Sequence, residues 1–178
     1  ELPVISDNYE IVNSFESTRY QKISEMVTKV SFYGKAVNSL GNEDVRISKR
    51  LFMPSSKLRG FESGKVGPIE NNDYIGGNYI SALNFSATLP KLLPSFQNID
   101  FSLFVDAANI WGVDYDSAID NSKIRSSTGI AMNLLTPIGP LNFSLSQPIT
   151  KSSTDKTESF RFNLGTTFWL VSKNSVFI

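Results

Sequence analysis

The sequence of 178 residues contains neither cysteine nor histidine. Without cysteine the chain has no thiol for a disulfide or for a thiolate metal site. Without histidine it lacks the commonest general base and a common metal ligand. It also lacks the run of about 18 apolar residues that a membrane-spanning helix requires. We therefore expect no metal site, no cofactor and no helical membrane anchor.

An excess of charge of one sign is missing as well, because 17 basic residues balance 17 acidic ones. Such a chain has no overall field that would attract nucleic acid, so no nucleic-acid partner is expected. Apolar residues make up 40% of the chain and aromatic residues 12%. The length suits one domain. The start at Glu1 has no signal-peptide pattern, which predicts either a mature protein or a fragment.

Most of the chain alternates apolar and polar residues with the period of two that β-strands produce. The expected strands are residues 8–20, 23–37, 76–89, 98–111, 123–135, 140–149 and 157–168. Long polar connections at 51–75, 112–122 and 150–156 alternate with tight ones at 89–96 and 137–140. Strands of about 12 residues with short turns on one side are typical of a transmembrane β-barrel. A soluble antiparallel barrel or sandwich gives a similar pattern, so alternation alone leaves both open.

The stretch Lys57-Leu58-Arg59-Gly60-Phe61 departs from this alternation. Gly60 permits a backbone turn that a residue with a Cβ resists. Arg59 carries a rigid fork of donors that suits a buried carboxylate. The following segment 60–65 is one residue too short for a phosphate-binding loop, and Val66 stands where that loop needs Ser or Thr. It also fails as a nucleophile elbow, because Ser63 is not its central residue.

Several segments, taken in order, resemble the BamA-type outer-membrane protein assembly factors. They are Leu58-Arg59-Gly60-Phe61, Gly76-Gly77-Asn78, Phe104-Val105-Asp106 with Trp111, the hairpin 136–144 with Gln147-Pro148, and 160–165. The resemblance implies an all-β fold, an antiparallel transmembrane β-barrel to which this chain contributes about seven C-terminal strands of about sixteen. Residues 1–168 would form the barrel portion, with 51–75 folded inward, and residues 169–178 would form a C-terminal extension.

The resemblance also implies how the motif loop, residues 51–75, is held. In the family the motif arginine, here Arg59, points into the barrel and pairs with acidic residues on the two strands that follow the loop. Asp106 matches the second of these acids. Asn84 stands at the first position, where it carries no charge but can accept a hydrogen bond through its carbonyl oxygen. One ion pair is therefore expected here.

The closing strand resembles the C-terminal recognition signal of outer-membrane barrels. Its apolar row is Phe160, Phe162, Leu164 and Phe168, and its polar row is Arg161, Asn163 and Thr167. The apolar row is expected to face lipid and the polar row the lumen. Gly165 matches a glycine at which the last strand of the family bends, so we expect it to mark a gate for substrate strands. A glycine packed beneath a neighbouring aromatic ring is the alternative.

A polar loop contains Asp114, Asp116 and Asp120. It lacks the glycine and the terminal glutamate of a helix-loop-helix calcium site. We interpret it as a solvated loop.

The resemblance implies a non-enzymatic insertase that folds and inserts β-barrel proteins into the bacterial outer membrane, as the central subunit of the assembly machinery. Its partners would be unfolded outer-membrane proteins, accessory lipoproteins and the lipid bilayer. A two-partner-type secretion pore of the same superfamily is one alternative, and a mitochondrial or plastid outer membrane is another location. A hydrolase is disfavoured because water or serine activation generally needs a histidine.

Overall fold

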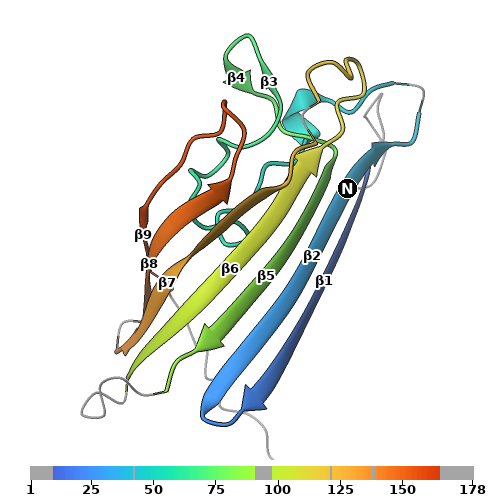
Figure 1. The fold of residues 1–178 in the computed structure, drawn as a ribbon. Helices are drawn as coiled ribbons and strands as arrows, with labels where there is room; N and C mark the ends of the chain where they lie inside the picture. Colours follow the sequence, from blue (N-terminus) through green and yellow to red (C-terminus); the bar gives the residue numbers. More distant parts are fainter. Residues whose placement is uncertain (1–9, 42, 91–97, 121, 138, 165–178) are drawn as a thin grey trace, which may run out of the picture.

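The structure is a computed structural model that describes residues 10–41, 43–90, 98–120, 122–137 and 139–164. Seven strands form one antiparallel sheet in the order β1-β2-β5-β6-β7-β8-β9 (Figure 1). They are β1 (Glu10–Ile23), β2 (Met26–Ser39), β5 (Tyr79–Thr88), β6 (Ile99–Trp111), β7 (Arg125–Thr136), β8 (Gly139–Thr150) and β9 (Phe160–Leu164). Each strand pairs with its neighbour in sequence order, so the sheet is a meander that curves around one concave side.

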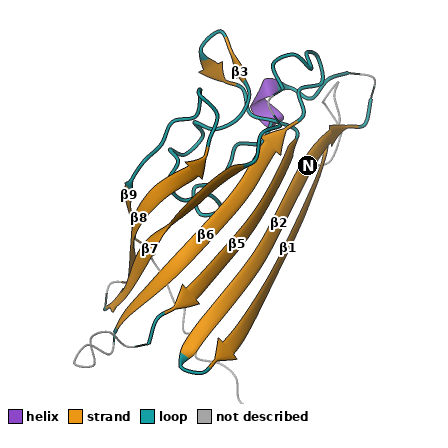
Figure 2. Cartoon of the chain, in the orientation of Figure 1, coloured by secondary structure: helices purple, strands orange, loops and turns teal. Residues whose placement is uncertain are grey.

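The connection between β2 and β5 holds three short elements. They are the 3-10 helix η1 (Ile47–Lys49) and the hairpin of β3 (Ile69–Glu70) and β4 (Asp73–Tyr74). This connection lies at the same end of the sheet as those between β6 and β7 and between β8 and β9 (Figure 2). None of the described residues forms a helix long and apolar enough to cross a membrane.

The predicted seven strands are confirmed, but the first turn lies later than predicted. The sequence placed the end of the first strand at residue 20 and the start of the second at 23, whereas β1 continues to Ile23, which pairs with Met26. The chain reverses at Ser24 and Glu25, and Ser24 has a φ of +56°. Neither glycine nor proline marks this turn, and the alternation continues through it, so the pattern could not locate it.

Many large apolar side chains of the strands lie on the convex face of the sheet, where they are exposed. Phe85, Leu103 and Ile130 are about half exposed in the middle of the sheet. Phe160, Phe162 and Leu164 lie on this exposed face, whereas Arg161 is buried on the opposite one. This segregation is what a membrane barrel requires, because lipid contacts one face and the lumen the other. Thr167 and Phe168 lie outside the described residues.

The buried apolar core lies between the concave face of the sheet and the inward connection, which is the motif loop of residues 51–75. Leu58, Phe61 and Val66 of the connection are each 1% exposed, and they pack with Ile80 of β5 and Ile110 of β6. Burial of large apolar side chains is the main favourable contribution to such packing. The segment 51–75 therefore folds against the inside of the wall and places the Arg59 motif there.

Candidate functional site

The Arg59 guanidinium forms a bidentate ion pair with Asp106 of β6. Its Nε donates to Oδ2 and its Nη2 donates to Oδ1, both at 2.7 Å, and the Arg59 backbone N–H donates to Oδ2 at 3.1 Å. Asp106 is fully buried, while the Arg59 side chain is 22% exposed. The guanidinium also lies 3.5 Å from the centre of the Phe104 ring. Two parallel charged hydrogen bonds fix the orientation as well as the position of the arginine.

Asn84 joins this pair as a donor of hydrogen bonds. The sequence indicated only that its carbonyl oxygen can accept a hydrogen bond. Instead its Nδ2 donates to Asp106 Oδ1 and to the Lys57 backbone oxygen, both at 2.8 Å. The reason is that both neighbouring groups are acceptors. Asn84 therefore stabilises the carboxylate and ties the loop backbone to β5.

Gly60 lets the loop approach the wall closely. Its φ of +85° belongs to a region that residues with a Cβ rarely adopt. A Cβ at this position would lie 3.1 Å from Ser146 Cβ and 3.3 Å from Ser127 Cβ. The Ser127 hydroxyl donates to the Arg59 backbone oxygen at 2.5 Å. Glycine is thus needed both for the turn and for the contact with β7 and β8.

The motif loop also reaches the edge of the sheet at β1. Lys57 Nζ lies 2.5 Å from Glu16 Oε1, and it sits 4.8 Å from the centre of the Tyr33 ring. The Lys57 side chain is 16% exposed and that of Glu16 is 51% exposed. Such a partly solvated pair contributes little to stability, but it specifies where the loop lies.

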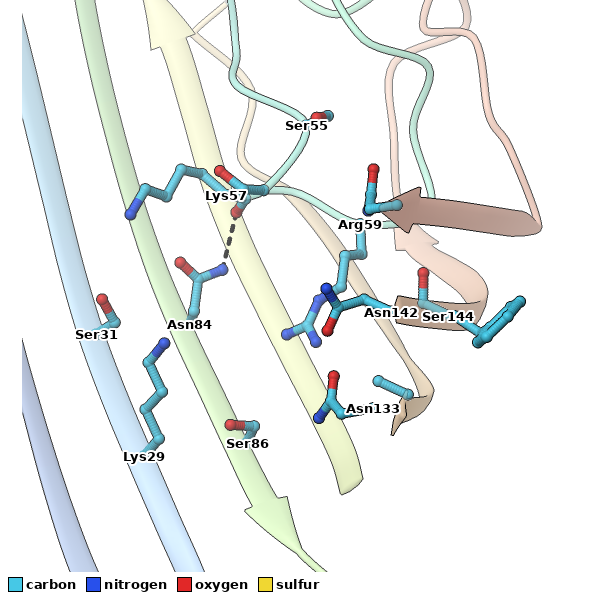
Figure 3. Close-up of a pocket in the computed structure, with 14 residues that line it drawn as sticks. Lys29, Ser31, Ser55, Lys57, Arg59, Asn84, Ser86, Asn133, Asn142 and Ser144 are labelled. Carbon is cyan, nitrogen blue, oxygen red and sulfur yellow. Dashed lines mark hydrogen bonds between the residues drawn. The ribbon is translucent and has the colours of Figure 1, made fainter. Parts of the chain in front are cut away.

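Below the loop the concave face forms a polar cavity of about 280 Å³. Figure 3 shows Lys29, Lys57 and Arg59 around it with serine and asparagine side chains from β2, β5, β7 and β8. Hydroxyl and amide groups of this kind suit water or another polar occupant. Among the described residues there is no cluster of carboxylates that could hold a metal ion.

The segment before β9 pairs with the motif loop through a short antiparallel contact of the two backbones. Phe61 and Thr157 form an isolated β-bridge. Its hydrogen bonds run from Glu158 N to Gly60 O at 3.1 Å and from Glu62 N to Lys156 O at 3.0 Å, and a further bond runs from Lys156 N to Lys65 O at 3.0 Å. The motif is therefore held by backbone pairing on one side and by the Asp106 carboxylate on the other.

A second buried ion pair lies nearer the loop end of the sheet. Arg125 of β7 donates from Nε to Asp155 Oδ2 at 3.0 Å and from Nη2 to Oδ1 at 3.2 Å. Asp155 also accepts from the backbone N–H groups of Gly67 and Ser152. Because Gly67 belongs to the inward connection, this carboxylate links that connection to β7 and to the loop before β9.

The acidic loop is exposed over residues 114–118, as predicted, but Asp114 also has partners within the protein. Asp114 has a side chain that is 22% exposed, and it accepts a hydrogen bond from the Val45 backbone N–H at 2.9 Å. It also contacts the Asn78 amide and lies 3.7 Å from Arg50. These partners come from distant parts of the chain, and no local pattern shows them. Asp116 does remain exposed.

Two tyrosines outside the strands of the sheet hold the loops together. The Tyr115 hydroxyl donates to Glu70 Oε2 at 2.6 Å, and this hydrogen bond, followed by burial, raises the pKa of Tyr115. The Tyr74 hydroxyl donates to the Thr154 backbone oxygen at 2.6 Å. Burial first, and then the Asp155 and Glu62 carboxylates, raise the pKa of Tyr74. Both hydroxyls therefore stay protonated donors at neutral pH.

The structure brings most of the predicted site residues together, and it adds others. Leu58, Arg59, Gly60, Phe61, Asn84 and Asp106 form one cluster. Gly165, the residue expected to mark a gate, lies outside the described residues, as does the expected extension 169–178. Sequence analysis missed Arg125 with Asp155 and the inward partners of Arg161. A charged residue on the inward row of a strand is the signal that could have marked both arginines.

Comparison with known proteins gives a consistent set of matches. The Omp85 superfamily domain matches residues 7–168. The outer membrane protein assembly factor BamA of Neisseria meningitidis is 33% identical over 144 residues, which cover 62% of this chain and 17% of that protein. BamA of Neorickettsia risticii is 23% identical over 162 residues, with 88% and 22% covered. A SAM50-like protein of Schizosaccharomyces pombe is 28% identical over 130 residues, with 67% and 27% covered.

A solved structure agrees with these sequence matches. The crystal structure of BamA from Haemophilus ducreyi lacking POTRA domains 1–3 superposes with a TM-score of 0.78 at 29% identity. The match covers 94% of this chain and 36% of that one. The chain spans between 17% and 22% of the length of the two BamA relatives above. It therefore corresponds to part of a BamA-type barrel wall.

Proposed function

The chain belongs to the Omp85 superfamily, and from that premise we propose that the protein is a non-enzymatic insertase for outer-membrane β-barrel proteins. Family membership places it in an outer membrane, and its bacterial relatives are BamA assembly factors. Unfolded outer-membrane proteins are the substrates, and accessory lipoproteins are the partners. The reaction breaks no covalent bond.

One observation carries this proposal: the motif loop is docked on the polar inner face of a sheet whose outer face is apolar. The outer face suits lipid, and the bidentate pair between Arg59 and Asp106 holds the loop against the wall. Because the motif loop is attached to the inner face, the sheet can keep its curvature while the strand at one edge changes its pairing. In an insertase that edge offers backbone groups to an incoming strand, which cannot leave them unpaired in lipid.

In this mechanism the substrate strand pairs with the edge of β9 that faces away from β8. Among the described residues no strand pairs with the second edge of β9. An incoming strand gains main-chain hydrogen bonds there as it leaves water. The predicted role of Gly165 as the bend of this gate belongs to the same proposal. A Gly165→Val variant that kept both the opening of this edge and substrate insertion unchanged would remove that role.

The test uses the whole protein that carries this chain, reconstituted into lipid vesicles. A urea-unfolded outer-membrane barrel protein is diluted into the vesicles, and its folded fraction is followed by heat-modifiable gel mobility and by protease resistance. We expect faster folding than with protein-free vesicles and slower folding with the Arg59→Ala variant. The control is Arg46→Gln, a change at an exposed arginine of the same connection.

Two outcomes would count against the proposal. Equal folding rates with and without the protein would refute an insertase. Transport of a soluble exported protein into the vesicles without any acceleration of barrel folding would instead identify a secretion pore of the same superfamily.

A further inference from the structure

We propose that Arg161 is a positioning residue that couples the motif loop to β9, so that β9 can leave its place only when the loop releases this arginine. Its consequence for substrate folding rests on the insertase function proposed above. The coupling itself is a property of the fold and can be measured separately.

Arg161 lies on the inward row of β9 and is 8% exposed. Its Nη1 donates to the Ser55 backbone oxygen at 2.7 Å, and its Nη2 donates to the Phe61 backbone oxygen. Nε and Nη2 also donate to Glu158 Oε2 at 3.1 and 2.8 Å. The guanidinium thus contacts the motif loop on both sides of Arg59, while its acidic partner comes from its own segment.

The two kinds of contact behave differently when β9 moves. Glu158 is three residues from Arg161, so its side chain keeps the charge paired when this segment moves with the strand, although its backbone N–H must then also release the Gly60 oxygen. The carbonyl oxygens of Ser55 and Phe61 belong to the motif loop, so these hydrogen bonds must break. A buried guanidinium is costly to leave without its acceptors. The loop therefore resists displacement of β9.

The loop can resist because it is fixed at other points of the wall. Lys57 reaches Glu16 on β1, and Arg59 reaches Asp106 on β6. Together with Arg161 on β9, these contacts place the loop across the concave side from one edge of the described sheet to the other (Figure 1). Loss of the central anchor at Arg59 should then weaken the attachment of β9, although the Arg59 guanidinium itself donates to Asp106 and not to the described residues of β9.

Hydrogen–deuterium exchange of the whole protein in lipid nanodiscs tests the coupling. In the Arg161→Gln variant the amides of β8 and β9 that join these strands should exchange at least about tenfold faster, because hydrogen bonds from a charged donor are lost. The Arg59→Ala variant should accelerate the same amides. In both variants the amides that join β1 and β2 should be unchanged, and Arg46→Gln should change none of them.

A double-mutant cycle separates coupling from simple loss of stability. If Arg161 acts through the docked loop, Arg161→Gln combined with Arg59→Ala should accelerate β9 exchange little more than either single change. Fully additive effects, or protection of β9 that is unchanged in Arg59→Ala, would overturn the coupling.

The substrate-folding assay is then read separately. If the wild type accelerates folding, a changed rate in Arg161→Gln that is not additive with Arg59→Ala supports the functional consequence, and an unchanged rate refutes that consequence. A wild type without activity refutes the insertase function, and the exchange data still decide the coupling.

Discussion

Arg125 and Asp155 are joined by an ion pair in which both side chains are fully buried. The arginine begins β7, and the aspartate lies in the loop before β9, 30 positions later. The carboxylate also receives the backbone N–H of Gly67 in the inward connection, so three segments converge on one charge. Removing one partner of a buried ion pair strongly destabilises the folded protein, because the other charge stays buried without compensation.

The first prediction is that Asp155→Asn weakens the wall at this point. Replacing the carboxylate by an amide removes the charge that compensates the buried Arg125. We expect a loss of about 3–5 kcal/mol in local stability. Hydrogen exchange at the start of β7 and in the inward connection measures it. Asp73→Asn, at an exposed residue of the β3–β4 hairpin, should change these amides little; an equal effect of both changes would contradict the prediction.

The second prediction concerns the close approach of Gly60 to the wall, for which Gly64 provides a matched control. Both glycines have positive φ, +85° and +69°. A Cβ at Gly60 meets Ser146 and Ser127 at 3.1 and 3.3 Å, whereas at Gly64 the nearest atom is Phe52 Cδ1 at 4.0 Å. Each substitution by alanine should cost about 1–2 kcal/mol for the backbone conformation, and Gly60→Ala should add the cost of crowding.

We expect the additional crowding to undock the motif loop. Limited proteolysis of the whole protein in detergent should cleave residues 51–75 faster in Gly60→Ala than in Gly64→Ala. The same cleavage rate in both variants would show that the backbone conformation, and not contact with β7 and β8, limits docking.

The strands, the turns and the ion pair of Arg59 and Asp106 differ in how far the sequence could predict them. Alternation defined seven strands, because lipid and lumen select opposite side chains at every second residue. The hairpin at Pro137 and Gly139 was marked by its turn residues, but the turn at Ser24 was not. The pair of Arg59 and Asp106 was predicted only through a family resemblance. Their separation along the chain is 47 residues, and no local spacing indicates such a contact.

Arg125 and Arg161, which point inward, show most clearly which contacts the sequence could not predict. Arg161 was placed in the lumen by its strand position, but two of its partners are backbone oxygens, which every residue possesses. Asp155 lies in the long polar connection 150–156, whose composition gives no sign of burial, yet it is 6% exposed. Polar residues at a barrel mouth and polar residues under a folded loop have the same composition. Only the packing of residues 51–75 decides which of them are buried.

The third prediction concerns the titration of Tyr115. The hydrogen bond to the Glu70 carboxylate raises the pKa of this tyrosine above its ordinary value of 10.0. Glu70→Gln should lower that pKa toward 10.0, because the amide carries no negative charge to oppose ionisation. Ultraviolet difference titration measures the change, with Tyr115→Phe identifying the signal. An unchanged titration curve would contradict a direct hydrogen bond.

The sign of the pH dependence follows from the same shift. A phenol whose pKa is higher in the folded state stabilises the fold while it is protonated. Its contribution is complete below pH 10, the unfolded value, and is lost as the pH rises through the raised folded value. Attachment of the β3–β4 hairpin to the loop after β6 should therefore weaken only in strong alkali, and Tyr115→Phe should remove this alkaline step.

The last prediction concerns Asn84, which stands where the family resemblance places an acid. Its Nδ2 donates to Asp106 Oδ1 and to the Lys57 backbone oxygen, so the site is built around a donor. Asn84→Asp replaces that donor by an acceptor, next to a carboxylate that is already fully buried. Two hydrogen bonds are lost and two like charges meet, which should cost about 1–3 kcal/mol in loop docking at neutral pH.

Protonation of the introduced carboxyl restores a donor, so docking in Asn84→Asp should recover as the pH falls. Its pKa is raised in the folded state by the like charge, and the stabilising protonated form is lost as the pH rises through that raised value. The protease sensitivity of residues 51–75 between pH 5 and pH 8 measures this recovery. Asn133→Asp, at an exposed position lining the same cavity, should show no such dependence. If Asn84→Asp docks as well as the wild type at neutral pH, Arg59 can serve two carboxylates at once, and the amide is not required.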